Sequence, residues 1–136
     1  MRYKFRGKRL DSGEWMYGFY QPHKNGNVIF IGDYGGLTDI PKLHKVLPES
    51  VGQWTGLVDR NGKEIYEGDV IRFTRNTGPI YKPTISSDVC VVRWIEERSS
   101  FRLCYKTQQQ KFHSSCFAKY EIIGNIHDNP ELMEVE

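Results

Sequence analysis

VGQWTGLVDRNGKEIYEGDVIRF, residues 51–73, is the stretch that decides the fold. It starts with a short apolar run around Trp54, turns at Asn61-Gly62, and continues with two further runs that Gly68 separates. An Asn-Gly pair between two such runs is a strong signal for a β-hairpin. The stretch therefore predicts three short strands joined by tight turns.

The residues before this stretch also predict strands. Tyr3 and Phe5 alternate with cations, and the aromatic run at residues 15–20 can pair antiparallel with them. Asn25-Gly26 signals another hairpin. We expect four strands here, over residues 2–6, 15–20, 28–31 and 44–47, with a loop over residues 32–43.

The second half continues the pattern of short apolar runs and turn residues. We expect strands over residues 89–94, 101–105 and 120–126, and an exposed loop over residues 76–87, which is rich in Thr, Gly, Pro and Ser. Asn129 and Pro130 suit the start of one helical turn at the end of the chain. No amphipathic helix of several turns appears. The pattern predicts a mainly β fold with little helix, in which five or so strands after residue 51 close into a small barrel.

Length and composition limit the class of protein. The 136 residues suit one domain or two very small ones, and the formal net charge is only +2. No apolar stretch approaches the length of a membrane-spanning helix, and no apolar region follows the basic start, so membrane insertion and classical secretion are not expected. The three cysteines form no CxxC pair, which favours a reducing cytoplasm.

Three segments of the chain resemble the YopX family of phage and prophage proteins. They are residues 51–73, residues 4–18 (KFRGKRLDSGEWMYG) and residues 120–132 (YEIIGNIHDNPEL). The resemblance implies a small β-rich protein with an SH3-like barrel over residues 51–136 and a β-hairpin region over residues 1–50 packed on it. It implies no enzyme activity and supplies no catalytic residues.

The residues of these motifs point mainly to structural roles. Glycines mark changes of chain direction or close approaches of backbones, and Asp69 can accept hydrogen bonds from nearby backbone amides. The aromatic members are expected to pack against the turn. The structural set is Gly52, Trp54, Gly56, Gly62, Tyr66, Gly68, Asp69, Gly124 and Asn125.

The basic N-terminus is the strongest binding signal in the sequence. Alternation places three of its cations on one strand face, where they can lie along phosphates while nearby aromatic rings stack on unpaired bases. Cations on an edge strand also prevent aggregation, and this second interpretation is favoured. The candidate binding residues are Arg2, Lys4, Arg6, Lys8, Arg9, Trp15 and Tyr17, with Tyr20 nearby.

Two groups of residues are candidate metal sites. Glu64, Glu67 and Asp69 form a tight acidic group, but solvated carboxylates are the favoured interpretation. The H-x-x-C pair of His113 and Cys116 suits zinc only if Cys90 and Cys104 join it across strands. No triad can be argued from His23, His44 or His127. We therefore predict no metal, no cofactor and no catalytic residue.

The sequence favours a non-enzymatic accessory protein that binds a host or phage macromolecule, with residues 76–87 and the basic N-terminus as candidate contact regions. The acidic residues at the end complement the basic start, so a homo-oligomer is expected. They are Asp128, Glu131, Glu134 and Glu136. The alternatives are a nucleic-acid-binding protein that uses the basic strand and, less favoured, a metal-dependent hydrolase.

Overall fold

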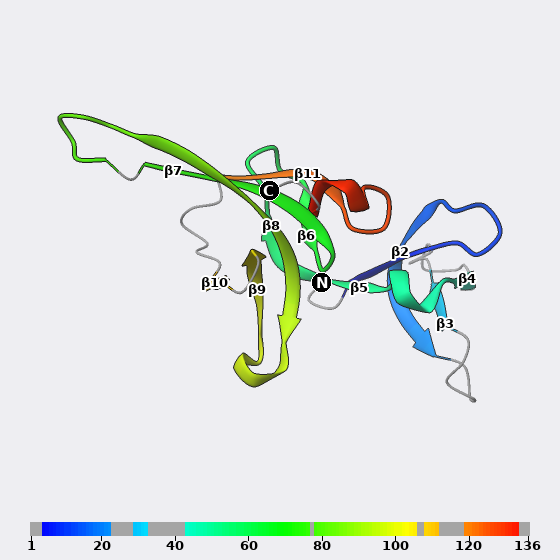
Figure 1. Cartoon of the computed structure of the whole chain (residues 1–136). Helices are drawn as coiled ribbons and strands as arrows, with labels where there is room; N and C mark the ends of the chain where they lie inside the picture. The colour runs from blue at the N-terminus through cyan, green and yellow to red at the C-terminus, as the bar shows by residue number, and fades with distance from the viewer. Residues whose placement is uncertain are drawn as a thin grey trace. The chain divides into compact units, whose positions relative to one another are not determined.

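The structure is a computed structural model that describes residues 4–22, 29–32, 43–76, 78–105, 108–111 and 119–133. The described residues form β-strands, short 3₁₀ turns and connections, with no α-helix among them (Figure 1). The predicted mainly β fold is confirmed. The chain divides into two compact units, Met1–Trp54 and Thr55–Glu136.

The first unit is an antiparallel arrangement of strands hydrogen-bonded in the order β4-β3-β2-β1, followed by the start of β5. Arg6 lies opposite Tyr17 and Lys8 opposite Trp15, so the predicted pairing of the first two strands is confirmed. A 3₁₀ turn, Pro48–Ser50, precedes β5. The strands are β1 (Phe5–Lys8), β2 (Trp15–Pro22), β3 (Ile29–Gly32), β4 (Leu43–Val46) and β5 (Gly52–Val58).

The end of β1 also reaches β4. Arg9 forms an isolated antiparallel bridge with Val46, and the Leu10 N–H donates to the Lys45 carbonyl at 3.0 Å. Gly7 permits this approach, because a Cβ placed there would lie 3.0 Å from Cγ2 of the buried Val46. A side chain at residue 7 would push the two strands apart.

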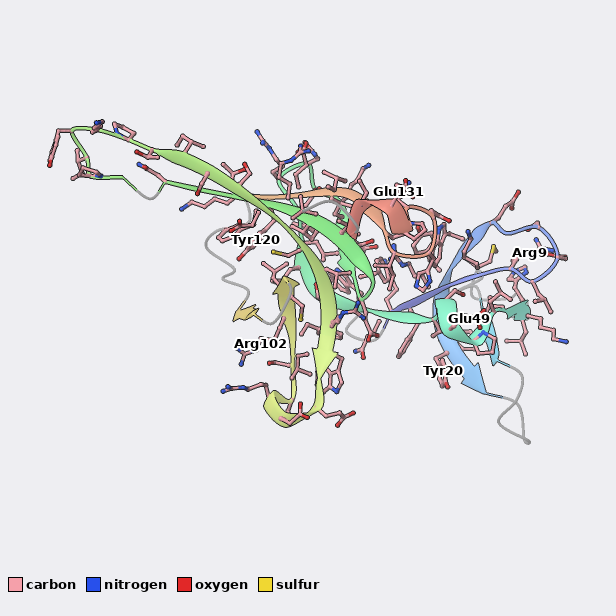
Figure 2. All side chains as sticks on the ribbon, in the orientation of Figure 1. Arg9, Tyr20, Glu49, Arg102, Tyr120 and Glu131 are labelled. Atoms are coloured by element: carbon pink, nitrogen blue, oxygen red, sulfur yellow. The ribbon has the colours of Figure 1, made fainter. Side chains whose placement is uncertain are left out.

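The second unit holds a five-stranded antiparallel sheet with the order β10-β9-β8-β7-β11, and a short β6 that neighbours β5. Its buried core cluster consists of Ile65, Ile71, Cys90, Val92, Leu103 and Tyr120. Tyr120, labelled in Figure 2, also contacts Phe73, with ring centroids 5.2 Å apart. The elements are β6 (Glu64–Tyr66), β7 (Asp69–Asn76), β8 (Ile85–Ile95), a 3₁₀ turn (Glu96–Arg98), β9 (Ser100–Tyr105), β10 (Gln108–Lys111), β11 (Tyr120–Asn125) and a 3₁₀ turn (Pro130–Met133).

The structure revises several of the sequence-based strands. β1 was expected over residues 2–6, but it lies at Phe5–Lys8. Residues 76–87 were expected to form a loop, but β7 runs to Asn76 and β8 starts at Ile85, and these two residues face each other in the ladder. β10 was not expected at all, because its run of glutamines has no apolar alternation. Across the described strands neither sheet order closes on itself, so the SH3-like barrel stays a prediction.

The C-terminal helical turn was predicted and is present as Pro130–Met133. Within the described ranges, no helix has the length and apolar character needed to cross a membrane. A loop was predicted over residues 32–43, but Gly32 ends β3 and Leu43 begins β4. Residues 33–42 and the Asn25-Gly26 turn lie outside the described residues.

Candidate functional site

One face of the first unit alternates cations with aromatic rings. Side chains alternate along a strand, so β1 places Lys4, Arg6 and Lys8 on the same side. The Arg6 guanidinium carbon lies 4.5 Å from the centroid of the Trp15 ring, and Lys8 Nζ lies 5.7 Å from the same ring. Lys4 Nζ lies 5.6 Å from the Trp54 ring. Three cation–π pairs therefore organise this face, which we call the cation–aromatic face.

The residues of the cation–aromatic face differ in how far they are exposed to solvent. Arg6 is only 5% exposed, so it does not offer its charge to solvent as a phosphate contact requires. Lys4 and Lys8 are partly buried, whereas Tyr17 is 48% exposed. Arg2 lies outside the described residues. The face is therefore a packed surface with one accessible ring, and less of a cationic stripe than the sequence indicated.

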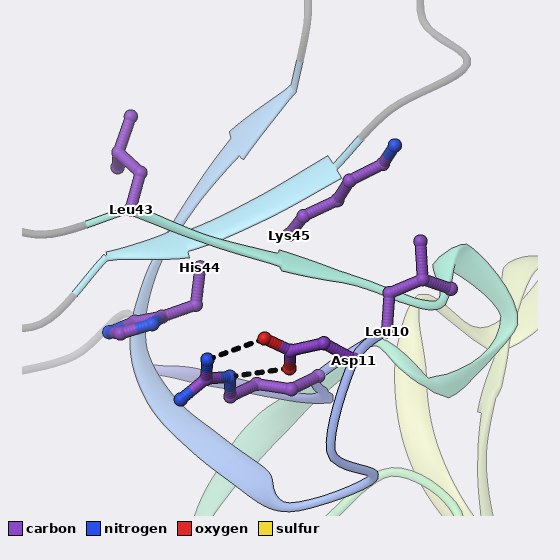
Figure 3. A pocket seen from close by; sticks show the side chains of 6 residues that line it. Leu10, Asp11, Leu43, His44 and Lys45 are labelled. Atoms are coloured by element: carbon purple, nitrogen blue, oxygen red, sulfur yellow. Dashed lines mark hydrogen bonds and ion pairs between the residues drawn. The ribbon is translucent and has the colours of Figure 1, made fainter.

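A cavity of about 460 Å³ lies at the connection between β1 and β2 (Figure 3). Its charged centre is a bidentate pair, in which Arg9 Nε and Nη2 donate to the two Asp11 oxygens at 2.9 and 2.7 Å. These hydrogen bonds hold the pKa of the Asp11 carboxyl below its ordinary value. The cavity is lined by Arg9, Leu10, Asp11, Leu43, His44 and Lys45.

The motif around Gly68 and Asp69 connects elements of the second unit. The buried Asp69 carboxylate accepts a hydrogen bond from the Tyr66 N–H at 2.8 Å. Gly68 adopts φ +93°, donates its N–H to the Val92 carbonyl and accepts from the Ile126 N–H. That positive φ favours glycine, because other L-residues are strained there.

The second motif closes the turn after β11. Asn125 Oδ1 accepts from the N–H groups of His127 and Asp128, and a Cβ at Gly124 would lie 2.5 Å from Asn129 Oδ1. A larger residue at position 124 would force the Asn129 and Leu132 side chains to move where this turn folds back on the strand. Gly52 and Trp54 lie in β5, Gly56 lies in the same strand with φ +90°, and Gly62 lies in the turn before β6.

Asp59 is a structural residue that the sequence analysis missed. Its side chain is 1% exposed and accepts three backbone hydrogen bonds, from Asn61 and Lys63 at Oδ1 and from Ile122 at Oδ2. The spacing D-x-N-G was the available signal, since an aspartate often bonds the backbone two residues on. Asp59 thus ties the Asn61-Gly62 turn to β11.

The acidic group does not gather around one point. Glu64 accepts from the Tyr66 hydroxyl at 3.2 Å, while Asp69 is buried against the backbone. Among the residues that the structure describes, no cluster of three His, Cys, Asp or Glu side chains can hold a metal ion. Within the described residues, Glu64, Glu67 and Asp69 therefore do not form a metal site.

The two described cysteines of the candidate zinc group lie on opposite faces of the sheet. Cys104 lies opposite Val91, so Cys104 and Cys90 point to opposite faces. Burial raises the pKa of the Cys104 thiol, which disfavours the thiolate that zinc requires. His113 and Cys116 lie outside the described residues, as does His23. His127 lies beside Gly68, where a Cβ would meet its ring at 3.3 Å.

The far end of the β7–β8 hairpin carries the most exposed apolar side chains described. We call residues 78–84 the arm tip. Ile80 is 98% exposed and Tyr81 89% exposed, and Ile85 at the start of β8 is 65% exposed. Figures 1 and 2 show the hairpin extending beyond the other strands of its unit, with the side chains of its end in solvent. Large adjacent apolar groups in water are typical of an interaction site.

Comparison with known proteins identifies the family. The model of the family described as YopX protein matches residues 4–134. A crystal structure of protein EF1440 from Enterococcus faecalis has the same fold, with a TM-score of 0.55, 23% identity, and coverage of 96% of this chain and 97% of that chain. A search among curated proteins gives no match.

Proposed function

Because the chain belongs to the YopX family, we propose that it is a non-enzymatic phage or prophage accessory protein that binds a host or phage macromolecule in the bacterial cytoplasm. The observation that supports this most is the arm tip, where Ile80 and Tyr81 are almost fully exposed. Exposed aromatic and aliphatic residues on a rigid scaffold are what a binding module presents.

A pull-down tests this proposal. The tagged chain is incubated with host lysate, with and without nuclease, and the retained protein and nucleic acid are both quantified. We expect protein to be retained through nuclease treatment. Retention of neither protein nor nucleic acid contradicts the binding function.

Self-association is part of the same proposal. Asp128 and Glu131 near the end of the chain and the partly exposed Lys4 and Lys8 of the cation–aromatic face carry opposite charges, which two copies can pair. Light scattering should give a mass that is a multiple of 15.9 kDa and that falls as salt rises. A monomeric mass at low salt contradicts it.

A second candidate function, binding of single-stranded nucleic acid, is favoured by the cation–aromatic face. Tyr17 presents an accessible ring beside cations, and one stacked base contributes about 1–3 kcal/mol. Tyr20 provides a matched control, since it is 40% exposed on the opposite face of β2, where it contacts Phe5.

Titration with a labelled single-stranded oligonucleotide decides this candidate. Tyr17→Ala should weaken binding about tenfold, while Tyr20→Ala should leave it unchanged. Equal losses from both variants, or no binding by the unmodified chain, exclude the cation–aromatic face as the contact.

A further inference from the structure

We infer that the arm tip docks into a protein partner whose surface offers an apolar pocket bordered by carboxylates. This inference rests on the proposed function and adds the class of partner and the residues that contact it. Ile80 and Tyr81 are the anchors, and Lys82 contacts the border.

The exposure of the anchors is the first step. Two adjacent large side chains, 98% and 89% exposed, bury little surface within the chain. A tyrosine of this kind is a common hot-spot residue, because its ring fills a pocket and its hydroxyl still finds a partner. The contact area that these side chains lack in the isolated chain must then come from another molecule.

The backbone of the arm tip is held in one shape, and this is the second step. Asn76 Oδ1 accepts from the N–H groups of Gly78 and Thr84 at 3.0 and 2.8 Å. The Lys82 N–H donates to the Pro79 carbonyl, which closes a turn with Ile80 and Tyr81 at its centre. A side chain at Gly78 would lie 2.3 Å from the Lys82 carbonyl oxygen. Such preorganisation lowers the entropic cost of binding.

The positive charge of the arm tip indicates which residues border the pocket of the partner. The arm tip, residues 78–84, contains one charged residue, Lys82, which is exposed next to Tyr81. Carboxylates around the pocket of the partner would attract this segment, whereas cations would repel it. The electrostatic contribution should therefore weaken as salt rises.

The cavity of about 460 Å³ in the first unit is a poor binding site for the arm tip of a second copy. Arg9, His44 and Lys45 line it, and Asp11 is already bonded by Arg9. Arg9 and Asp11 offset each other's charge, so Lys45 leaves this border with a positive charge that would repel Lys82. A membrane surface is also a poor match, because two apolar side chains give little buried area and stable anchoring takes more. A different protein with an acidic border fits the observations better.

The experiment begins with photo-crosslinking in the host. A photoreactive aromatic amino acid replaces Ile80 in the full chain, and the control replaces Leu10, which is 51% exposed in the first unit. The protein crosslinked from residue 80 and not from residue 10 is identified and purified. Its binding to the unmodified chain is then titrated against Tyr81→Ser, Lys82→Glu, Lys82→Gln and Leu10→Ser.

We expect Tyr81→Ser to weaken binding at least about tenfold. Lys82→Glu should weaken it more than Lys82→Gln, most strongly at low salt, while Leu10→Ser binds like the unmodified chain. If Tyr81→Ser binds unchanged, or if residue 80 crosslinks only to another copy, the docking inference is wrong. Binding of the arm tip only to vesicles of zwitterionic and anionic lipids also overturns it.

The two proposals fail in different ways. If the pull-down retains a protein but no crosslink forms at residue 80, the arm tip is not the contact and the binding function stands. If the pull-down is empty, both proposals fall. Circular dichroism of every variant confirms that a loss of binding does not arise from unfolding.

Discussion

At the base of the β7–β8 hairpin Ile71 is fully buried, whereas at its far end Ile80 is 98% exposed. The two residues belong to one continuous hairpin, but different interactions hold its two ends. Core packing with Cys90 and Val92 fixes the base. At the far end, Asn76 Oδ1 accepts hydrogen bonds from the N–H groups of Gly78 and Thr84. The difference teaches that packing holds the buried base of the hairpin, whereas local hydrogen bonds hold the backbone that carries the exposed apolar side chains.

Truncation at the base should have the largest effect. Ile71→Ala removes buried methylenes and leaves a cavity, which should lower the free energy of unfolding by about 2–5 kcal/mol. Ile80→Ala is the matched control at the far end and should change stability by less than about 0.5 kcal/mol. Urea denaturation measures the free energy of unfolding of both variants. Equal losses would contradict the view that the base is held by packing and the far end is not.

Removal of the Asp69 carboxylate should have the next largest effect. Asp69→Ala leaves the Tyr66 N–H in a buried position without its acceptor, at a cost of about 1–3 kcal/mol. Asp69→Asn retains an oxygen acceptor and should recover part of the loss. If the two variants are equally unstable, the negative charge matters more than the hydrogen bond.

Asn76→Ala tests whether hydrogen bonds to this side chain hold the far end of the hairpin. It removes the acceptor for two exposed N–H groups, those of Gly78 and Thr84, so the global loss should be about 1 kcal/mol or less. Amide hydrogen exchange should accelerate at residues 78–84 and stay unchanged at Ile71. Unaltered exchange across the arm tip would show that other contacts fix its shape.

Tyr81→Ser should have the smallest effect on folding. The ring is 89% exposed, so its loss should shift the free energy of unfolding by less than about 0.5 kcal/mol. Thermal unfolding measures this directly. A clear destabilisation would mean that the ring packs within the chain and is not available to a partner.

Much of the fold could be predicted from local sequence. Alternation and turn residues predicted every described strand except β10, because side-chain period and turn chemistry act over a few residues. β10 was missed since glutamines carry no apolar period, and its pairing with β9 comes from the ladder. The full length of β7 and β8 was not predicted, because the Thr and Ser residues that pair there are also common in loops.

The candidate site was less predictable. The sequence marked residues 76–87 as a contact region, but it did not distinguish the anchors, because exposure depends on how far the hairpin extends. It placed Arg6 on a charged face, whereas the ring of Trp15 covers the guanidinium. That contact follows from strand register, which residue spacing alone does not determine.

The Asp59 carboxylate has a consequence for the order in which the chain folds. Two of its donors lie two and four residues away, while the third, Ile122, lies 63 residues away. Closing a short loop costs less entropy than closing a long one, so we expect the turn to form early and the bond to β11 to form late. During synthesis, the Asp59 carboxylate can thus accept its third hydrogen bond only after β11 has been made and has paired within the sheet.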